Sequence, residues 1–351
     1  MAKKVKSLYI HIPFCKSICT YCDFVREIPK TQNQEDEYID IICNQIKKEV
    51  KNKFMTIYIG GGTPNSLSFN NLKKILTTCN KIKNRCCEFT IECNPEFVNE
   101  DQVKLFKKYG VNRISLGVQC TNEYINKKFN RKHSLNDVFQ AIKLLRKNNI
   151  KNMSLDFIYG YKLMSLKDIQ NDINFVINNK IPHVSFYSLE LKNNSVLAKQ
   201  HYKNDELKIE EQFDYIIKKM KANKFIRYEV SNWCINNNYQ SKHNLCYWNT
   251  DDWKGIGLGA YGLENMNYYH YVGDTKKINK IVQHYTPHEY YFQVLMMGLR
   301  LAKGLNLKNK LHANAFNYFK NKIDSNLIMV KNNHVIARNI NQIDEILISI
   351  I

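Results

Sequence analysis

The sequence predicts an α/β protein that consists of a partial (β/α)6 barrel and a smaller C-terminal domain of α+β or mainly helical structure. Between residues 8 and 222, short apolar runs alternate with longer amphipathic runs, which is typical of a parallel sheet with helices outside. Six strand–helix units occur there, fewer than the eight of a closed barrel, so an open barrel is expected. Beyond about residue 223, closely spaced aromatic residues replace the alternation.

The elements of the barrel follow one another in order. The apolar runs predict strands at residues 8–12, 55–59, 89–92, 113–119, 153–159 and 184–189. The amphipathic runs predict helices at residues 35–50, 71–82, 99–109, 135–148, 166–178 and 206–222. We therefore expect residues 1–225 to form the barrel and residues 226–351, with a mostly helical tail from about His288, to form the second domain.

The composition is that of a globular protein in a reducing compartment. Hydrophobic residues make up 44% of the 351 residues, and no apolar run is long enough to span a membrane. The basic start, residues 1–6, is not followed by the apolar core of a signal peptide. The eleven cysteines are odd in number, which argues against a disulfide framework. A cytoplasmic location is expected.

The net charge of +20 is spread along the chain. Nucleic-acid binding would predict basic residues on one face with aromatic residues between them, whereas lysines occur in nearly every predicted helix. We therefore predict no nucleic-acid partner. The positive excess still favours anionic partners such as acidic lipid surfaces or porphyrin carboxylates.

Three cysteines follow the first strand, which Pro13 ends. Cys15, Cys19 and Cys22 have the spacing Cys-x3-Cys-x2-Cys, which places three sulfurs close enough to hold one polynuclear iron site. Three thiolates leave one iron of a four-iron cluster open to another ligand. A structural zinc site is the alternative, but His11 lies on the predicted strand and no second cysteine pair follows.

The residues around these cysteines, Tyr-Ile-His-Ile-Pro-Phe-Cys and Tyr-Cys-Asp-Phe, resemble the cluster motif of the radical S-adenosylmethionine (SAM) superfamily. These flanking sequences are most similar to those of the branch that contains oxygen-independent coproporphyrinogen III dehydrogenase (HemN) and the haem chaperone HemW. The resemblance implies a [4Fe-4S] cluster on Cys15, Cys19 and Cys22 whose open iron takes the amino and carboxylate groups of SAM. It also implies that the reduced cluster cleaves SAM to a 5′-deoxyadenosyl radical.

A glycine run, residues 60–64, follows the second strand as Gly-Gly-Gly-Thr-Pro. Glycines let the backbone approach a ligand closely, although a plain turn is their commoner use. The run is similar to the family motif whose backbone meets the amino group of SAM. That similarity assigns Gly61, Gly62 and Thr63 to the SAM pocket.

Polar residues occupy the carboxyl ends of three later strands, where a barrel of this kind places its site. They are Glu92, Gln119 and Asp156. Their local sequences are similar to those of the family, as is that of Arg131. The resemblance implies that these four residues contact the ribose, adenine edge or carboxylate of SAM, as Tyr9 does near the cluster.

His243 is the candidate haem ligand of the C-terminal part. It lies in His-Asn-Leu-Cys-Tyr-Trp, where an imidazole beside aromatic residues could ligate haem iron. A buried histidine that hydrogen-bonds inside a domain interface is the structural alternative. The sequence is similar to the His-Asn-x-x-Tyr-Trp motif of HemW-type proteins, which implies the haem role, and Cys246 is a rival ligand.

The run from 255 to 262 contains four glycines. A dinucleotide loop would need a βαβ context and an acidic residue at the right distance, which are missing. The run is similar to the family's Gly-Ile-Gly-x-Gly-Ala-His-Ser, but Tyr261 and Gly262 replace its histidine and serine. These changes put in doubt any role of the motif's histidine.

Two functions remain, a haem carrier and an enzyme. HemN-type dehydrogenases resemble Cys-x3-Cys-x2-Cys-x-Cys and carry an N-terminal extension, whereas this chain has Phe24 at the fourth position and few residues before its first strand. The resemblance therefore favours a haem chaperone that binds the cluster, SAM and haem and delivers haem to client proteins. A membrane-surface client and a homodimer are further expectations. The alternative is coproporphyrinogen III dehydrogenase, and whether SAM is consumed stays open.

Overall fold

The structure is a computed structural model that describes residues 5–350, so the first four residues of the basic start lie outside the described part. Six parallel strands form its centre and follow one another across the sheet in sequence order. They are β1 Ser7–Ile12, β2 Phe54–Gly61, β3 Lys83–Cys93, β4 Arg113–Gln119, β5 Asn152–Tyr159 and β6 His183–Ser188. This order confirms the predicted α/β class with an open, partial barrel.

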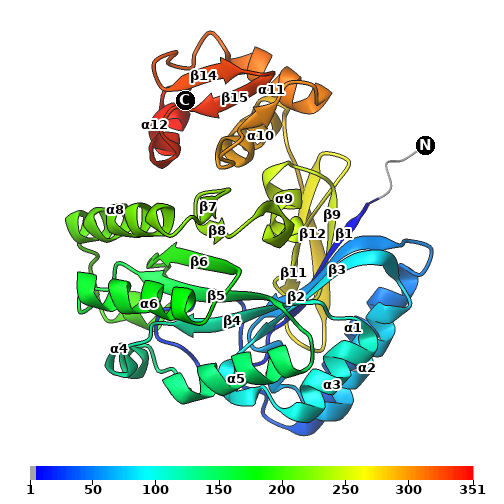
Figure 1. Ribbon diagram of the computed structural model, residues 1–351. Coiled ribbons are helices and arrows are strands. Elements are labelled where there is room, and N and C mark those ends of the chain that lie inside the picture. The colour runs from blue at the N-terminus through cyan, green and yellow to red at the C-terminus, as the bar shows by residue number, and fades with distance from the viewer. Residues whose placement is uncertain (1–4, 351) are drawn as a thin grey trace.

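Helices connect the parallel strands and cover the outer face of the sheet (Figure 1). The main ones are α1 Gln32–Lys48, α2 Phe69–Asn80, α3 Glu100–Tyr109, α5 Leu135–Lys147, α6 Leu166–Asn178 and α8 Glu206–Ala222. Each begins after a residue whose side chain accepts a hydrogen bond from the first turn, and Ser134 and Ser165 form capping boxes with Asp137 and Asp168. Such a cap stabilises a helix by about 1 kcal/mol.

The structure differs from the predicted elements mainly in short or polar segments. Two short helices, α4 Glu123–Lys128 and α7 Val196–Lys199, were not predicted, because they are too short to show a helical period. Strand β3 begins at Lys83, earlier than predicted, because its first residues are polar and partly exposed. An apolar run therefore marks only the buried half of this strand.

The two faces of the parallel sheet have opposite polarity. A row of residues in register, Ile10, Ile59, Ile91, Ile114 and Met153, crosses five strands, and each is at most 1% exposed. Burying such a side chain stabilises the fold by about 1.5–3 kcal/mol. The neighbouring row, which points to the opposite face, contains tyrosine, threonine, arginine and asparagine (Tyr9, Tyr58, Thr90, Arg113 and Asn152). The apolar row packs under the helices, and the polar row lines the barrel interior.

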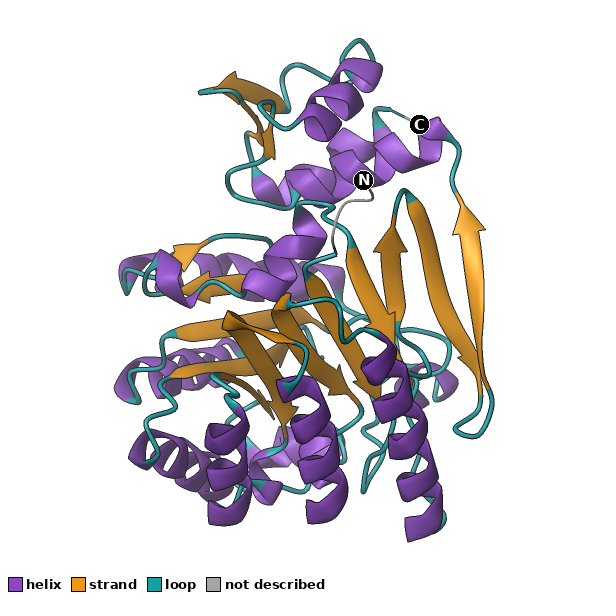
Figure 2. Cartoon of the chain, turned by 90° about the vertical axis from the view of Figure 1, so that its right-hand side faces the viewer, coloured by secondary structure: helices purple, strands orange, loops and turns teal. Residues whose placement is uncertain are grey.

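The C-terminal part adds strands to both edges of this sheet. The added strands are β7 Ile226–Arg227, β8 Asn232–Cys234, β9 Trp253–Ile256, β10 Tyr261–Glu264, β11 Asn267–Gly273 and β12 Ile278–His284. The full order is β12-β11-β10-β9-β1-β2-β3-β4-β5-β6-β8-β7, and β9 runs parallel to β1. Figure 2 shows the outermost strands extending beyond the helices. The division at residues 225 and 226 stays a prediction, and strands from both parts share the sheet.

A second hydrophobic core lies in the C-terminal part, above the large sheet in Figure 1. Its helices are α9 Lys242–Trp248, α10 Pro287–Leu299, α11 Lys310–Phe319 and α12 Ile343–Ile348. Its small antiparallel sheet contains β13 Leu305–Asn306, β14 Ile328–Lys331 and β15 His334–Ala337. The mostly helical tail therefore begins at Pro287 and includes a small sheet, which makes this part α+β, one of the two predicted classes.

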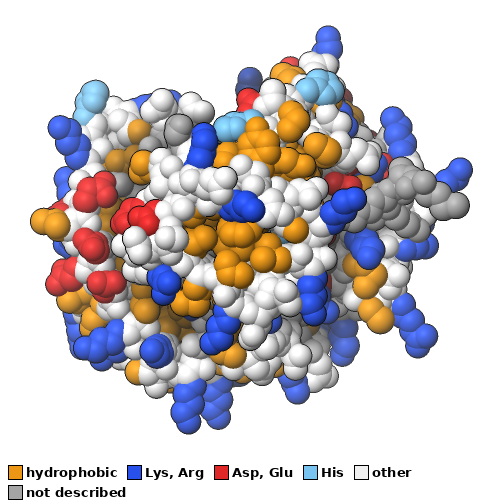
Figure 3. All heavy atoms as spheres, turned by 90° about the horizontal axis from the view of Figure 1, so that it is seen from above, with side chains coloured by type: hydrophobic (Ala, Val, Ile, Leu, Met, Phe, Trp, Pro, Cys, Tyr) orange, Lys and Arg blue, Asp and Glu red, His pale blue; other side chains and the backbone are white. Residues whose placement is uncertain are grey.

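The surface agrees with a dispersed positive charge. Seen from above in Figure 3, lysine and arginine side chains are spread between hydrophobic and neutral ones instead of forming one stripe. Within residues 5–350, each helix is too short or too polar to cross a lipid bilayer.

Candidate functional site

A cavity of about 700 Å³ opens at the carboxyl ends of strands β2 to β6. Its volume lies within the range of small-molecule sites, roughly 300–1,000 Å³. It brings together ten of the residues that the sequence predicted for cluster and SAM binding. They are Cys15, Cys19, Cys22, Gly61, Gly62, Thr63, Glu92, Gln119, Arg131 and Asp156.

The three cysteines lie on one loop, residues 13–28, which we call the cluster loop. Two backbone hydrogen bonds close its base: the amide of Cys15 donates to the Glu27 carbonyl at 2.9 Å, and the amide of Glu27 donates to the Pro13 carbonyl at 2.8 Å. The amide of Thr20 donates to the carbonyl of Phe129, just after α4, at 3.1 Å. The loop is therefore held against the sheet at both its base and its middle.

The thiols have the surroundings of metal ligands. All three are free, and polar donors face two of them: Thr63 Oγ1 lies 3.5 Å from Cys15 Sγ and Arg131 Nη1 lies 3.7 Å from Cys19 Sγ. Burial raises the pKa of Cys22 to about 12. Metal coordination deprotonates such thiols, and these donors then stabilise the negative sulfurs. The donor set fits an iron–sulfur cluster.

The described part of the chain has no comparable site for a single metal ion. Among the residues that the structure describes, no three histidine, cysteine, aspartate or glutamate side chains converge on a point that one ion could occupy. The three cysteines share one cavity wall without forming a site of that kind.

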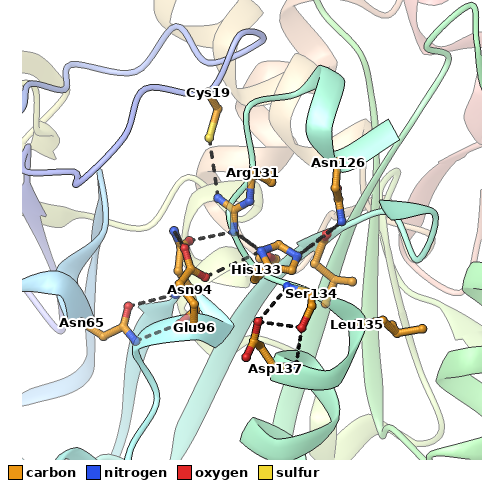
Figure 4. A network of polar contacts seen from close by, with 12 residues as sticks. Cys19, Asn65, Asn94, Glu96, Asn126, Arg131, His133, Ser134, Leu135 and Asp137 are labelled. Atoms are coloured by element: carbon orange, nitrogen blue, oxygen red, sulfur yellow. Dashed lines mark hydrogen bonds and ion pairs between the residues drawn. The ribbon is translucent and has the colours of Figure 1, made fainter. Parts of the chain in front are cut away.

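Arg131 connects the cluster loop to strands β3 and β4 (Figure 4). Its Nη2 donates to Asn94 Oδ1 at 2.9 Å and to the Gly117 carbonyl at 2.7 Å. Asn94 is held in turn by Asn65, which exchanges two hydrogen bonds with its backbone. Asn94 also lines the cavity and was not predicted as a site residue. The sequence signal for Asn94 was its position two residues after Glu92, at the end of the same strand.

Glu92 lies against the glycine run. Its Oε2 accepts a hydrogen bond from the Gly61 amide at 3.0 Å, and its Oε1 accepts one from the Tyr58 hydroxyl at 2.8 Å. A Cβ atom on Gly60 would lie 2.8 Å from the Glu92 carboxyl carbon, so only glycine fits there. Burial raises the pKa of Glu92 to about 7, so the carboxyl group changes charge near neutral pH.

Asp156 and Gln119 also line the cavity. Asp156 accepts hydrogen bonds from the hydroxyl groups of Ser115, Ser154 and Ser185 at 2.6, 2.9 and 2.8 Å. Gln119 has a φ of 66°, and the register of β4 and β5 shifts at this point. A non-glycine residue in this left-handed region is strained, and such strain is concentrated at ligand sites.

The structure does not bring Tyr9 or His243 to the cavity wall. The Tyr9 hydroxyl donates to His11 Nδ1 at 3.0 Å. His243 is 1% exposed, and its Nδ1 and Nε2 lie 2.8 Å from the Thr56 hydroxyl and 2.7 Å from the Tyr247 hydroxyl. Burial lowers the pKa of His243 to about 3, which keeps the imidazole neutral. The roles predicted for Tyr9 and His243 stay predictions.

The glycine run at residues 255–262 spans the end of β9, the connection that follows it and the start of β10. Gly257 has a φ of 100°, and a Cβ there would lie 2.5 Å from the His11 carbonyl oxygen. A Cβ on Gly259 would lie 2.6 Å from Val25 Cβ. The glycines therefore let this connection pack tightly on β1 and on the cluster loop.

Comparisons with known proteins agree with this geometry. A model of the radical SAM superfamily matches residues 9–176. A protein named haem chaperone HemW in Bacillus subtilis (strain 168) is 33% identical over 335 residues, covering 87% of this chain and 86% of the relative. One of the same name in Lactococcus lactis is 33% identical over 322 residues, covering 87% and 84%.

Among solved structures, that of the coproporphyrinogen III oxidase HemN from Escherichia coli has a TM-score of 0.81. It covers 99% of this chain and 90% of that chain at 16% identity. At this identity the likeness concerns the fold alone.

Proposed function

The chain belongs to the haem chaperone HemW family of the radical SAM superfamily, and we propose that it binds a [4Fe-4S] cluster, SAM and haem and delivers haem to client proteins. The observation that carries the proposal is the composition of the cavity wall. Three cysteines line it together with the SAM candidates, and Phe24, 63% exposed, stands where the dehydrogenase motif has a fourth cysteine. Cluster binding through free thiols and haem delivery would take place in the cytoplasm, where thiols stay reduced.

Cys15, Cys19 and Cys22 would hold the cluster. When bound and reduced, the cluster supplies the electron that cleaves SAM in this superfamily. Arg131 and Thr63 donate hydrogen bonds to two of the three sulfurs, which disperses their negative charge.

The SAM candidates present complementary groups to a polar ligand. Glu92 on β3 and Asp156 on β5 offer carboxylate oxygens for hydroxyl and amino groups. Gln119, at the end of β4 between them, offers a side-chain amide. Gly61 and Gly62 keep the backbone free of side chains at the same wall. These residues bind and orient the ligand, and no proton transfer is required of them.

Haem is the proposed cargo. The positive excess of the chain suits the carboxylates of a porphyrin. Client identity, a membrane-surface location of the client and a homodimer remain part of the proposal. His243 as the iron ligand is a prediction with a structural cost, because iron would have to displace one of its two hydroxyl partners.

One experiment separates the carrier from the dehydrogenase. The full chain is reconstituted anaerobically with iron and sulfide, supplied with SAM and coproporphyrinogen III, and titrated in parallel with hemin by absorbance. We expect hemin uptake and no protoporphyrinogen. Steady formation of protoporphyrinogen would overturn the proposal in favour of the dehydrogenase.

The cluster assignment has a matched control. Cys22→Ala should abolish the visible absorbance of the reconstituted cluster, because two thiolates cannot hold it. Cys86→Ala, which changes an exposed cysteine outside the motif, should leave it unchanged. A cluster that survives Cys22→Ala would contradict the assignment.

A further inference from the structure

A second buried side chain, His133, lies two residues after Arg131 and belongs to the same polar network (Figure 4). His133 is 4% exposed, so it is buried more deeply than Arg131, which is 9% exposed. The segment that carries both residues is fixed against the cluster loop, because Asn130 Nδ2 donates to the Ile18 carbonyl at 2.7 Å. The direction of the Arg131 guanidinium group is therefore set by the groups that surround the side chain.

The surroundings of the His133 ring determine which nitrogen carries the proton. Nε2 lies 3.1 Å from the Val118 carbonyl oxygen, which can only accept a hydrogen bond, so Nε2 carries the hydrogen. The Asn126 amide nitrogen beside it already donates to the carbonyls of Cys120 and Val118, at 2.6 and 3.3 Å. Nδ1 is therefore an acceptor, and it faces Arg131 Nη2 at 3.4 Å. Burial, followed by the charge of Arg131, lowers the pKa of His133 to about 4, so the ring is neutral at pH 7.

The two terminal nitrogens of Arg131 have different partners. Nη1 lies 3.7 Å from the sulfur of Cys19. Nη2 donates to Asn94 Oδ1 and to the Gly117 carbonyl, and His133 Nδ1 is its third acceptor. Because a guanidinium group is planar and rigid, holding Nη2 also fixes the direction of Nη1. The contact with Cys19 therefore depends on the acceptors around Nη2.

The Glu96 carboxylate is a competing partner for the Arg131 guanidinium group. Its Oε2 atom is buried, has no hydrogen-bond partner in the described part of the chain and lies 3.7 Å from His133 Nδ1. A buried carboxylate oxygen without a donor is costly, and a guanidinium group would satisfy it. Since one imidazole nitrogen lies close to both groups, the His133 ring occupies the space that Arg131 would need to approach Glu96.

We propose that His133 is a positioning residue of the cluster site; this inference rests on the cluster binding proposed above. The ring holds Arg131 against Cys19 by accepting a hydrogen bond from Nη2. It also blocks the approach of Arg131 to Glu96. Hydrogen bonds to the sulfurs help to set the reduction potential of an iron–sulfur cluster, and Arg131 also lines the cavity with the SAM candidates. Loss of the ring should therefore change both the cluster potential and the SAM affinity.

The test measures the midpoint potential of the reconstituted cluster in the full chain, by a redox titration followed by electron paramagnetic resonance, and SAM affinity by calorimetry. His133→Ala should make the potential more negative, because a cationic donor leaves the Cys19 sulfur, and should weaken SAM binding about tenfold. His133→Gln should restore both values, because its amide can accept from Arg131 and donate to Val118. Lys132→Ala, which changes the exposed neighbour, should alter neither value.

Glu96→Gln separates positioning from a merely structural role. Without the competing charge, Arg131 has less reason to leave Cys19, so His133→Ala should shift the potential much less in the Glu96→Gln background than in the wild type. An effect caused only by the lost volume of the ring would be equal in both backgrounds, and that result would overturn the inference. His133→Leu fills the space without an acceptor and should shift the potential in the same direction, which keeps the test independent of the stability of His133→Ala.

The outcomes separate this inference from the proposed function. A wild-type chain that holds no cluster after reconstitution overturns both together. A cluster-loaded chain whose potential and SAM affinity are unchanged by His133→Ala or by His133→Leu overturns the inference alone. A more negative potential in these variants, recovered in His133→Gln, supports it.

Discussion

His243 and His270 place the same imidazole in opposite settings. His243 is buried on α9, with hydroxyl partners on both nitrogens and the Tyr58 ring stacked 5.1 Å away. His270 is half-buried on β11, with one stacked ring and no polar partner in the described part of the chain. A sequence pattern alone does not distinguish a histidine that holds two elements together from one whose ring nitrogens face solvent. The surroundings do.

His243 has a structural task that His270 lacks. His243 joins Thr56 on β2 to Tyr247 on α9, and its backbone amide donates to the Glu88 carboxylate at 3.0 Å. These contacts tie the helix to the floor of the barrel. The comparison therefore predicts large stability effects for His243 and small ones for His270.

The largest effect is expected for His243→Ala. Removing the ring leaves two buried hydroxyls unpaired and a cavity beside Tyr58, which should cost about 2–4 kcal/mol of unfolding free energy. Urea denaturation followed by circular dichroism measures this cost. A variant as stable as the wild type would show that the buried contacts contribute little and would reopen His243 as a free ligand.

The pH dependence of the same site is the next largest effect. The pKa of His243 is about 3 in the folded protein and about 6.5 in the unfolded chain, so protons bind the unfolded state preferentially between these values. Its stabilising contribution is complete above pH 6.5 and falls as the pH decreases, by about 2 kcal/mol at pH 5. The stability difference between the wild type and His243→Gln should shrink by this amount from pH 7 to pH 5. A constant difference would contradict the buried neutral ring.

Tyr58→Phe tests whether the residues packed around His243 also contribute to SAM binding in the cavity. The variant keeps the ring beside His243 but removes the hydroxyl that donates to Glu92. Losing one such hydrogen bond costs about 1 kcal/mol, so SAM affinity should fall about fivefold. Calorimetry on the cluster-loaded protein measures it, with His270→Ala as the control that keeps full SAM affinity. Unchanged SAM affinity in Tyr58→Phe would show that the residues around His243 do not contribute to the SAM site.

The smallest effect is expected for the stability of His270→Ala. The side chain is half-buried and loses only its stacking on Tyr261, so the unfolding free energy should change by about 0.5 kcal/mol or less. The urea curves used for His243→Ala give this value. A loss as large as that of His243→Ala would mean that His270 is structural and would remove the contrast.

Local patterns were sufficient for much of this protein. The spacing of Cys15, Cys19 and Cys22 places three thiols on one loop whatever the rest of the chain does. The alternation of apolar and amphipathic runs predicts parallel strands with helices, and polar residues at the strand ends predict one shared site. The sequence by itself therefore determined the strand–helix order of the barrel, the cluster loop and ten residues of the cavity wall.

The tertiary structure decided what depends on distant partners. Strands β9 to β12 extend the parallel sheet at the edge formed by β1, and no local pattern within residues 253–284 predicts this position. The burial of His243 depends on Thr56, 187 residues away, and the ring of Tyr261 lies beside that of His270 only because the β10–β11 ladder pairs these two residues. Pairing register and burial are non-local properties, since they are set by which elements meet and not by the residues next along the chain.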